Sequence, residues 1–170
     1  AVAGTVLTAA GTTTVTAGDT LAAGAVTIDG GSDISVTNTG VTSGTITIGA
    51  TTAPTGSITV SSTTTGNTPT HGAIATTGGT TVSITQADTN AVNTLSTAGA
   101  VTVTGNADTT SVTTVDAAVV AASATKAGHT AGAVTVNDAN KASTTAAGTI
   151  TDVSITNAAA VTVNSSALTT

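Results

Sequence analysis

The sequence contains no phenylalanine, tryptophan, tyrosine, methionine or cysteine. Aromatic side chains normally contribute the largest buried area per residue, so a core here has to be built from valine, isoleucine, a few leucines and alanine. Such a core is thin, and it favours two close-packed walls over a broad globular interior. The absence of cysteine excludes disulfide bonds and thiolate metal sites.

Charge is scarce as well. The 170 residues include eight aspartates, no glutamate and no arginine, with Lys126 and Lys141 as the only lysines and a formal net charge of −6. Nucleic acid is excluded as a partner, because phosphates are held by clustered lysine and arginine and single-stranded bases by aromatic stacking. No apolar run approaches the roughly twenty residues of a membrane helix, so we expect no direct membrane insertion. The N-terminus lacks the pattern of a signal peptide, so we expect that a signal has been removed or that export uses another route.

Threonine is the commonest residue, and with alanine, glycine, valine and serine it makes up most of the chain. Threonine and valine fit a pleated surface, and glycine supplies the turns between short strands. One segment, GAVTIDGGSDISVTN from Gly24 to Asn38, aligns without gaps with GAIATTGGTTVSITQ from Gly72 to Gln86. On both sides of the central glycines, apolar and hydroxyl residues alternate with the period of a β-strand.

The repeat recurs at unequal intervals. Further copies begin at Gly99 and Gly132, and two half-units, GTITI at Gly44 and GSITV at Gly56, lie between the copies that begin near Gly24 and Gly72. We interpret residues 1–170 as a single repetitive β domain or segment with loop insertions.

Two all-β architectures satisfy this pattern. The first is a β-helix, a solenoid-like stack of short strands; the second is an antiparallel β-sandwich, in which the strand–turn–strand unit would be a hairpin. Small residues, uneven insertions and the absence of aromatics favour the β-helix. An alanine-rich run after Asp116, which ends at Gly128 with Lys126 nearby, fits a short helix as well as a strand and loop.

The sequence offers little catalytic chemistry. His71 and His129 lie beside glycines, with no partner to complete a zinc site, so we expect both to be solvated loop residues. There is no GxSxG, Walker or GxGxxG motif, and no aromatic platform for a sugar. We therefore predict that the chain is not an enzyme and has no catalytic, cofactor-binding or metal-ligating residues of its own.

Calcium is the one ligand that the sequence leaves open. Asp29 and Asp33 flank the glycine pair of the first copy, Asp108 lies in the corresponding turn of the third copy, and Asp138 lies in the cluster NDAN. Oxygen-rich turns can hold this cation, which takes about six to eight oxygen ligands. Aspartate and asparagine are also ordinary turn formers that cap the backbone. The turn of the second copy, TTGGT, has no acid, so calcium binding is not a property of the repeat.

The recurring segments GAVTVTG, from Gly99, and GTITDVSITNAAAVTVNSSALTT, from Gly148, resemble those of large bacterial S-layer proteins and related surface proteins of proteobacteria. The resemblance covers most of the chain from Gly72 onward. It implies export by a type I secretion route, calcium-assisted self-assembly on the outer membrane, and a β-rich, partly β-helical body. The calcium-binding nonapeptide GGxGxDxUx of such proteins is missing, so no calcium ligand is carried over and we interpret the chain as an interior section.

These observations lead to two hypotheses. In the first, the chain is a structural subunit of an extracellular bacterial surface layer or filament; its partners are copies of itself, and a cell-surface polysaccharide is a candidate anchor. Scarce charge at strand edges is a liability for a monomer but favours a polymer. In the second, the chain is a stalk or passenger segment of a secreted adhesin, which predicts the same strands without self-association.

Overall fold

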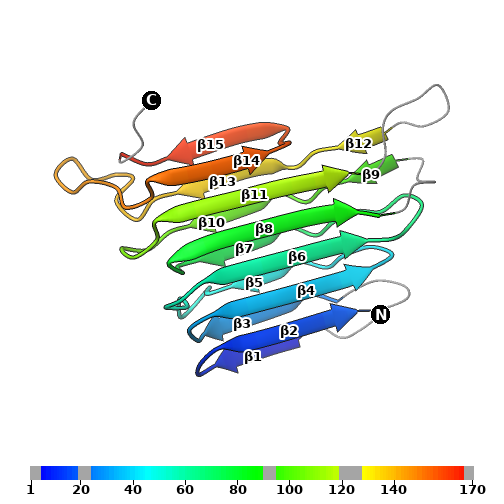
Figure 1. The fold of residues 1–170 in the computed structure, drawn as a ribbon, viewed down its shortest axis with the longest axis horizontal. Helices are drawn as coiled ribbons and strands as arrows, with labels where there is room; N and C mark the ends of the chain where they lie inside the picture. Colours follow the sequence, from blue (N-terminus) through cyan, green and yellow to red (C-terminus); the bar gives the residue numbers. More distant parts are fainter. Residues whose placement is uncertain (1–4, 19–23, 90–94, 119–127, 167–170) are drawn as a thin grey trace.

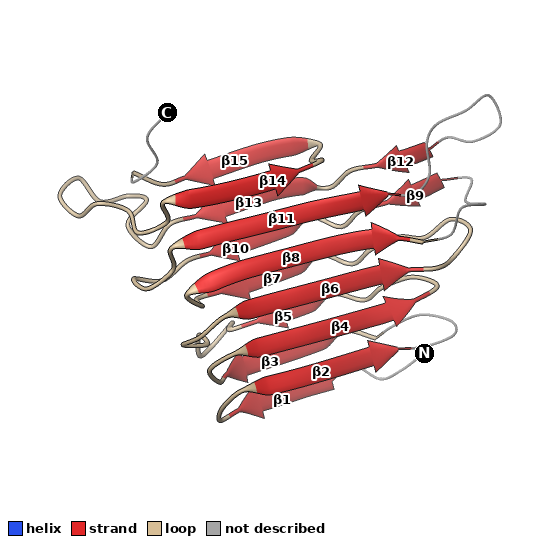
Figure 2. Cartoon of the chain, in the orientation of Figure 1, coloured by secondary structure: helices blue, strands red, loops and turns tan. Residues whose placement is uncertain are grey.

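The computed structural model describes residues 5–18, 24–89, 95–118 and 128–166. These residues form β-strands and no helix, and thus no helix that could cross a membrane. The strands are stacked in two large facing sheets, with a short third sheet beside them (Figure 1, Figure 2). The prediction of an all-β, solenoid-like stack is confirmed at this level.

Along the chain, strands of the first large sheet alternate with strands of the second. We call a strand of the first sheet, together with the strand of the second sheet that follows it, a rung. In the described residues the first sheet has seven strands, in the order β1 (Thr5–Ala9), β3 (Val26–Gly30), β5 (Ile46–Ile48), β7 (Ile74–Thr77), β10 (Val101–Thr104), β13 (Ala133–Asn137) and β15 (Ala160–Asn164). The second has six, in the order β2 (Thr13–Gly18), β4 (Ile34–Gly40), β6 (Ile58–Thr64), β8 (Thr81–Asp88), β11 (Ser111–Ala118) and β14 (Asp152–Thr156). The third sheet pairs β9 (Leu95–Thr97) with β12 (Gly128–Thr130).

The glycine pairs turn the chain from one sheet to the other. Gly30 and Gly31 have φ angles of 75° and 93°, in the left-handed region that glycine adopts at little cost. The flanking strands β3 and β4 lie in different sheets, and the strand pairings of the described residues are all parallel. The alternative of an antiparallel sandwich built from hairpins is therefore wrong for these residues.

The two half-units of the sequence form one complete rung. The half-unit at Gly44 supplies β5, and the half-unit at Gly56 supplies β6; β5 pairs with β3 and β7, and β6 with β4 and β8. The connections between strands differ in length, and residues 138–151 form a long one between β13 and β14. The alanine-rich run begins within β11, and its residues 119–127 lie outside the described part.

The core lies between the two sheets as rows of aliphatic side chains in register. One row on the first sheet consists of Val26, Ile46, Ile74, Val101 and Val134. A row on the second sheet consists of Ile34, Ile58, Val82 and Val112. Burial of each such side chain contributes about 1.5–3 kcal/mol, so the rows supply the main apolar stabilisation without any aromatic residue.

The glycines that open the repeats stack directly on one another. We call this stack the glycine ladder; it consists of Gly24, Gly44, Gly72, Gly99 and Gly132. A Cβ atom on Gly44 would lie 2.5 Å from the carbonyl carbon of Gly24, and Cβ atoms on the later members would approach the backbone of the preceding rung more closely still. The recurrent glycine is therefore required by the close approach of neighbouring rungs.

We predict that Gly72→Ala destabilises the protein by about 1–3 kcal/mol, because the added methyl group overpacks the site. The added methyl group would press on the backbone of Gly44 and Thr45, which cannot rotate away as a side chain could. The matched control is Gly11→Ala, because nothing lies within 4 Å of a Cβ at Gly11. Urea unfolding followed by far-ultraviolet circular dichroism measures both variants; equal stability of the two would contradict the role of the ladder.

Candidate functional site

Toward the end of the second-sheet strands, the inward positions change from aliphatic to polar. The alternation that buries Ile34 and Val36 continues to Asn38, which lies in register with Ser62, Gln86 and Asp116 on the next strands. We call the buried or half-buried side chains gathered here the polar column: Asn38, Ser43, Ser62, Thr64, His71, Gln86, Asp88, Ser96, Asp116 and His129. The column is the only described interior region of the protein that is rich in titratable groups.

His71 is buried within this column, with 3% of its surface exposed. Its Nδ1 lies 3.2 Å from Oγ of Ser62 and 3.5 Å from Oγ of Ser43, and its Nε2 lies 3.2 Å from Oγ1 of Thr64. The expectation of a solvated loop histidine is therefore wrong. Local sequence suggested a loop, but residue 71 follows Thr70, which forms a parallel bridge with Thr97 and so brings the segment against the third sheet.

Burial lowers the pKa of His71 below its ordinary value of 6.5, because the charged ring loses its hydration. The carboxylates of Asp116 and Asp88 oppose this effect, and His129 adds to it. The folded protein therefore favours a neutral His71.

His129 lies between a serine and an aspartate. Its Nδ1 is 2.6 Å from Oγ of Ser96, and its Nε2 is 2.6 Å from Oδ2 of Asp116. With Nε2–H donating to the carboxylate, Nδ1 of the ring can accept a hydrogen bond from the serine hydroxyl. The side chain of His129 is 12% exposed, so the expectation that it is a solvated loop residue is wrong as well.

Serine, histidine and aspartate in one hydrogen-bonded chain are also the components of a hydrolase triad, in which the serine attacks a bound substrate. Here Ser96 is 0% exposed, so its hydroxyl does not face solvent or any open cleft. The arrangement is suited to satisfying buried polar groups across three strands, β9, β11 and β12.

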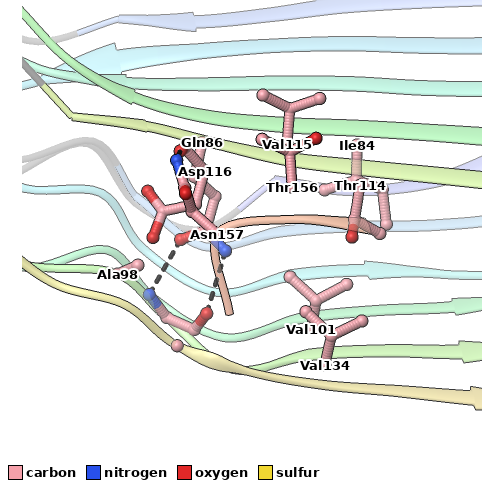
Figure 3. Close-up of a pocket in the computed structure, with 12 residues that line it drawn as sticks. Ile84, Gln86, Ala98, Val101, Thr114, Val115, Asp116, Val134, Thr156 and Asn157 are labelled. Atoms are coloured by element: carbon pink, nitrogen blue, oxygen red, sulfur yellow. Dashed lines mark hydrogen bonds between the residues drawn. The ribbon is translucent and has the colours of Figure 1, made fainter. Parts of the chain in front are cut away.

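Gln86 ties the second sheet to the glycine ladder. Its Nε2 donates to the carbonyl oxygen of Gly99, and its Oε1 accepts from the backbone N–H of Gly99, both at 2.8 Å (Figure 3). Beside this pair, Figure 3 shows a small cavity next to Asp116 and Asn157. The cavity measures about 10 Å³, which is room for about one water molecule and not for an organic substrate.

Some buried polar atoms have no hydrogen-bond partner in the described part of the protein. Both amide atoms of Asn38 and the hydroxyls of Thr76 and Thr114 are in this position. Thr114 lines the small cavity, where a single water could bond to its hydroxyl.

Two of the aspartates considered as calcium ligands, Asp29 and Asp33, cap backbone N–H groups of the next rung. Oδ1 of Asp29 accepts from the backbone N–H of Thr51 at 2.8 Å, and Oδ1 of Asp33 accepts from the N–H and the hydroxyl of Ser57, each at 2.8 Å. The Ser57 bonds hold the pKa of Asp33 below its ordinary value. Asp108 is exposed in the turn before β11.

Asp138 is the most enclosed of these carboxylates, at 1% exposure. Its Oδ2 accepts from the backbone N–H groups of Thr149 and Ile150 at 2.7 Å, and its Oδ1 from that of Asn140 at 2.8 Å. Burial raises the pKa of Asp138, but these hydrogen bonds and one from the Ser165 hydroxyl outweigh it, so the pKa lies below its ordinary value. Asp138 thereby closes the long connection before β14.

The four candidate aspartates are not brought together. Within the described ranges, no three or more histidine or aspartate side chains form a group that could hold a metal ion. The structure gathers instead Ser96, Asp116 and His129, which sequence reasoning did not connect. One signal was present: Asn38 and Gln86 end the two aligned repeats at the inward-facing position, where a polar residue marks the start of the column.

Comparison of the chain with known protein families and with curated protein sequences finds no match.

We predict that the protein loses stability as the pH falls below 6.5 and that His71→Gln reduces this loss. The folded state lowers the pKa of His71, so protonation of this side chain favours the unfolded chain. The stability that neutral His71 contributes is therefore fully present above pH 6.5 and is lost as the pH falls through the folded-state pKa. Glutamine keeps polar atoms near Ser62 and Thr64 but cannot take up the proton. Urea unfolding at pH values on both sides of 6.5 compares the two proteins; parallel pH dependences would show that His71 does not contribute.

Proposed function

We propose that this chain is a non-catalytic structural element of an extracellular bacterial surface layer or filament and acts by self-assembly. The observation that carries the proposal is the regular stack of parallel strands in the described residues, made by a chain with very little charge (Figure 1).

Surface charge keeps soluble proteins apart, and this chain has only eight aspartates and two lysines among its 170 residues. Such scarce charge is a liability for a monomer and less so for a subunit that packs against copies of itself.

The interior supports the non-catalytic part of the proposal. Ser96 is fully buried, and the cavity beside Asp116 holds about one water molecule. The outer surface of the first sheet carries rows of hydroxyl groups, such as Thr27 beside Thr47 and Thr102 beside Thr135. Rows of this kind stabilise a sheet through cross-strand contacts and need no ligand.

Extracellular location, type I export and calcium-assisted assembly belong to the same proposal. The resemblance of the repeated segments to S-layer proteins supports them. A calcium ion between two copies would need ligands from both, because the described aspartates of one copy are not grouped.

The alternative is a stalk or passenger segment of a secreted adhesin. The stack of rungs along one axis favours it, because a continuous ladder makes a stiff spacer (Figure 2). The two proposals differ in self-association.

We predict that the purified chain assembles into sheets, tubes or fibres as its concentration rises, and that calcium promotes this assembly or is required for it. Light scattering follows the increase in mass, and electron microscopy shows the form. Monomers that persist at high concentration, with and without calcium, would contradict self-assembly and favour the stalk.

A further inference from the structure

We propose that the short third sheet is part of an acid-released latch, which detaches from the second sheet when His71 is protonated while the two large sheets stay packed together. The latch consists of β9, β12 and the residues Thr70 and His71, which lie against β9 (Figure 1). It combines weak anchoring in the apolar core with titratable contacts to the second sheet.

The backbone joins the parts of the latch to one another. β9 pairs with β12 in parallel, and Thr70 forms a parallel bridge with Thr97. The N–H of His71 donates to the carbonyl oxygen of Thr97, and the N–H of Ala98 donates to that of Thr130, both at 2.9 Å. These segments precede three successive rungs, and their shared hydrogen bonds allow them to move as one unit.

The latch is weakly anchored in the aliphatic core. Among the described residues, the core cluster contains no side chain from β9 or β12. Leu95, the only large apolar residue of these two strands, is 39% exposed. Segments with few buried apolar contacts open locally at a lower free energy than the whole protein unfolds. The latch can therefore open while the aliphatic rows between the large sheets remain packed.

The two histidines of the latch reach the second sheet. The ring of His71 contacts the hydroxyl groups of Ser62 and Thr64 on β6, both at 3.2 Å. Nε2 of His129 lies 2.6 Å from Oδ2 of Asp116 on β11. The attachment is thus polar, and histidine is the side chain whose charge ordinarily changes between about pH 5 and pH 8.

His71 is the contact that acid weakens. The hydroxyl groups beside it carry no charge and its ring is buried, so a proton on the ring would place a poorly hydrated positive charge inside the protein. Burial lowers the pKa of His71 for this reason. The stability that neutral His71 gives the closed latch is fully present above pH 6.5 and is lost as the pH falls through the lower pKa of the closed state.

The other titratable groups that face His71 modify this effect. Asp88 on β8 and Asp116 on β11 favour its protonated form, whereas His129 in the latch opposes it. Ser43 and the described residues of β6 and β9 contribute no titratable side chain. When His129 is itself protonated, its Nε2–H still donates to Asp116, so this link survives and adds positive charge near His71.

The opening is limited by the glycine ladder. The side-chain amide of Gln86 bonds to both backbone groups of Gly99, two residues after β9, and an amide does not titrate. Gly72, which follows His71, is stacked between Gly44 and Gly99. We therefore expect the first-sheet strands that follow these glycines to stay in place when the latch opens.

Hydrogen exchange of the dilute natural chain at about pH 8 and about pH 5 tests the latch. Mass spectrometry resolves the exchange by segment, and each rate is compared with that of the unfolded chain at the same pH to give a protection factor. We expect the protection of β9 and β12 to fall several-fold at the lower pH, while that of β6 and β8 is unchanged. No fall in the latch, or an equal fall in all four strands, would overturn the proposal.

Two variants identify the titrating contact. His71→Gln keeps polar atoms near Ser62 and Thr64 but cannot be protonated, so we expect its latch to be equally protected at both pH values. The matched control, His129→Gln, loses the link to Asp116 but keeps His71; its latch should exchange faster at both pH values and still respond to acid. An acid response that persists in His71→Gln, or one that is lost in His129→Gln, would show that His71 does not release the latch.

A titration of the imidazole protons of the natural chain by nuclear magnetic resonance tests the same point without any variant. We expect the midpoint of His71 to lie below 6.5 and to coincide with the pH at which β9 and β12 lose protection. A midpoint of His71 at or above 6.5, or a loss of protection at a different pH, would overturn the proposal.

Discussion

The structure depends on how closely each rung approaches the next. Strands in register are about 4.8 Å apart, and along the glycine ladder the backbones come together so tightly that no Cβ atom fits between Gly72 and Gly44. Once this approach is fixed, the two-residue alternation places each side chain above one of the same kind on the neighbouring rung. Rows of aliphatic side chains and rows of hydroxyl groups result. A thin core without aromatic residues is then sufficient, because every rung buries its apolar side chains against both its facing strand and its neighbours.

The same stacking accounts for the arrangement of the polar side chains. Inside, it aligns Asn38, Ser62, Gln86 and Asp116 in one row, and the Ser62 hydroxyl of this row contacts the buried ring of His71. The titratable side chains of the polar column are thereby enclosed between strands and away from solvent.

Much of the fold could be predicted from the sequence, and what could not has a physical reason. The absence of aromatics indicated a thin aliphatic core, and the glycine-led repeat located most of the rungs. The glycine pair Gly30–Gly31 could not show whether the chain forms a hairpin or a turn between facing sheets. Either kind of turn is flanked by the same alternation of apolar and polar residues. The burial of His129 depends on Ser96, 33 residues away, and on Asp116, so no local pattern could reveal it. The capping role of the aspartates was one of two readings that the sequence left open.

The most direct test of this account is the set of proton–proton contacts along the glycine ladder in a nuclear magnetic resonance spectrum. Parallel stacking predicts that the Hα protons of Gly72 contact the residues beside both Gly44 and Gly99, with corresponding contacts between Ile34 and Ile58 on the second sheet. Antiparallel contacts between β3 and β4 across Gly30–Gly31, in place of these, would contradict it.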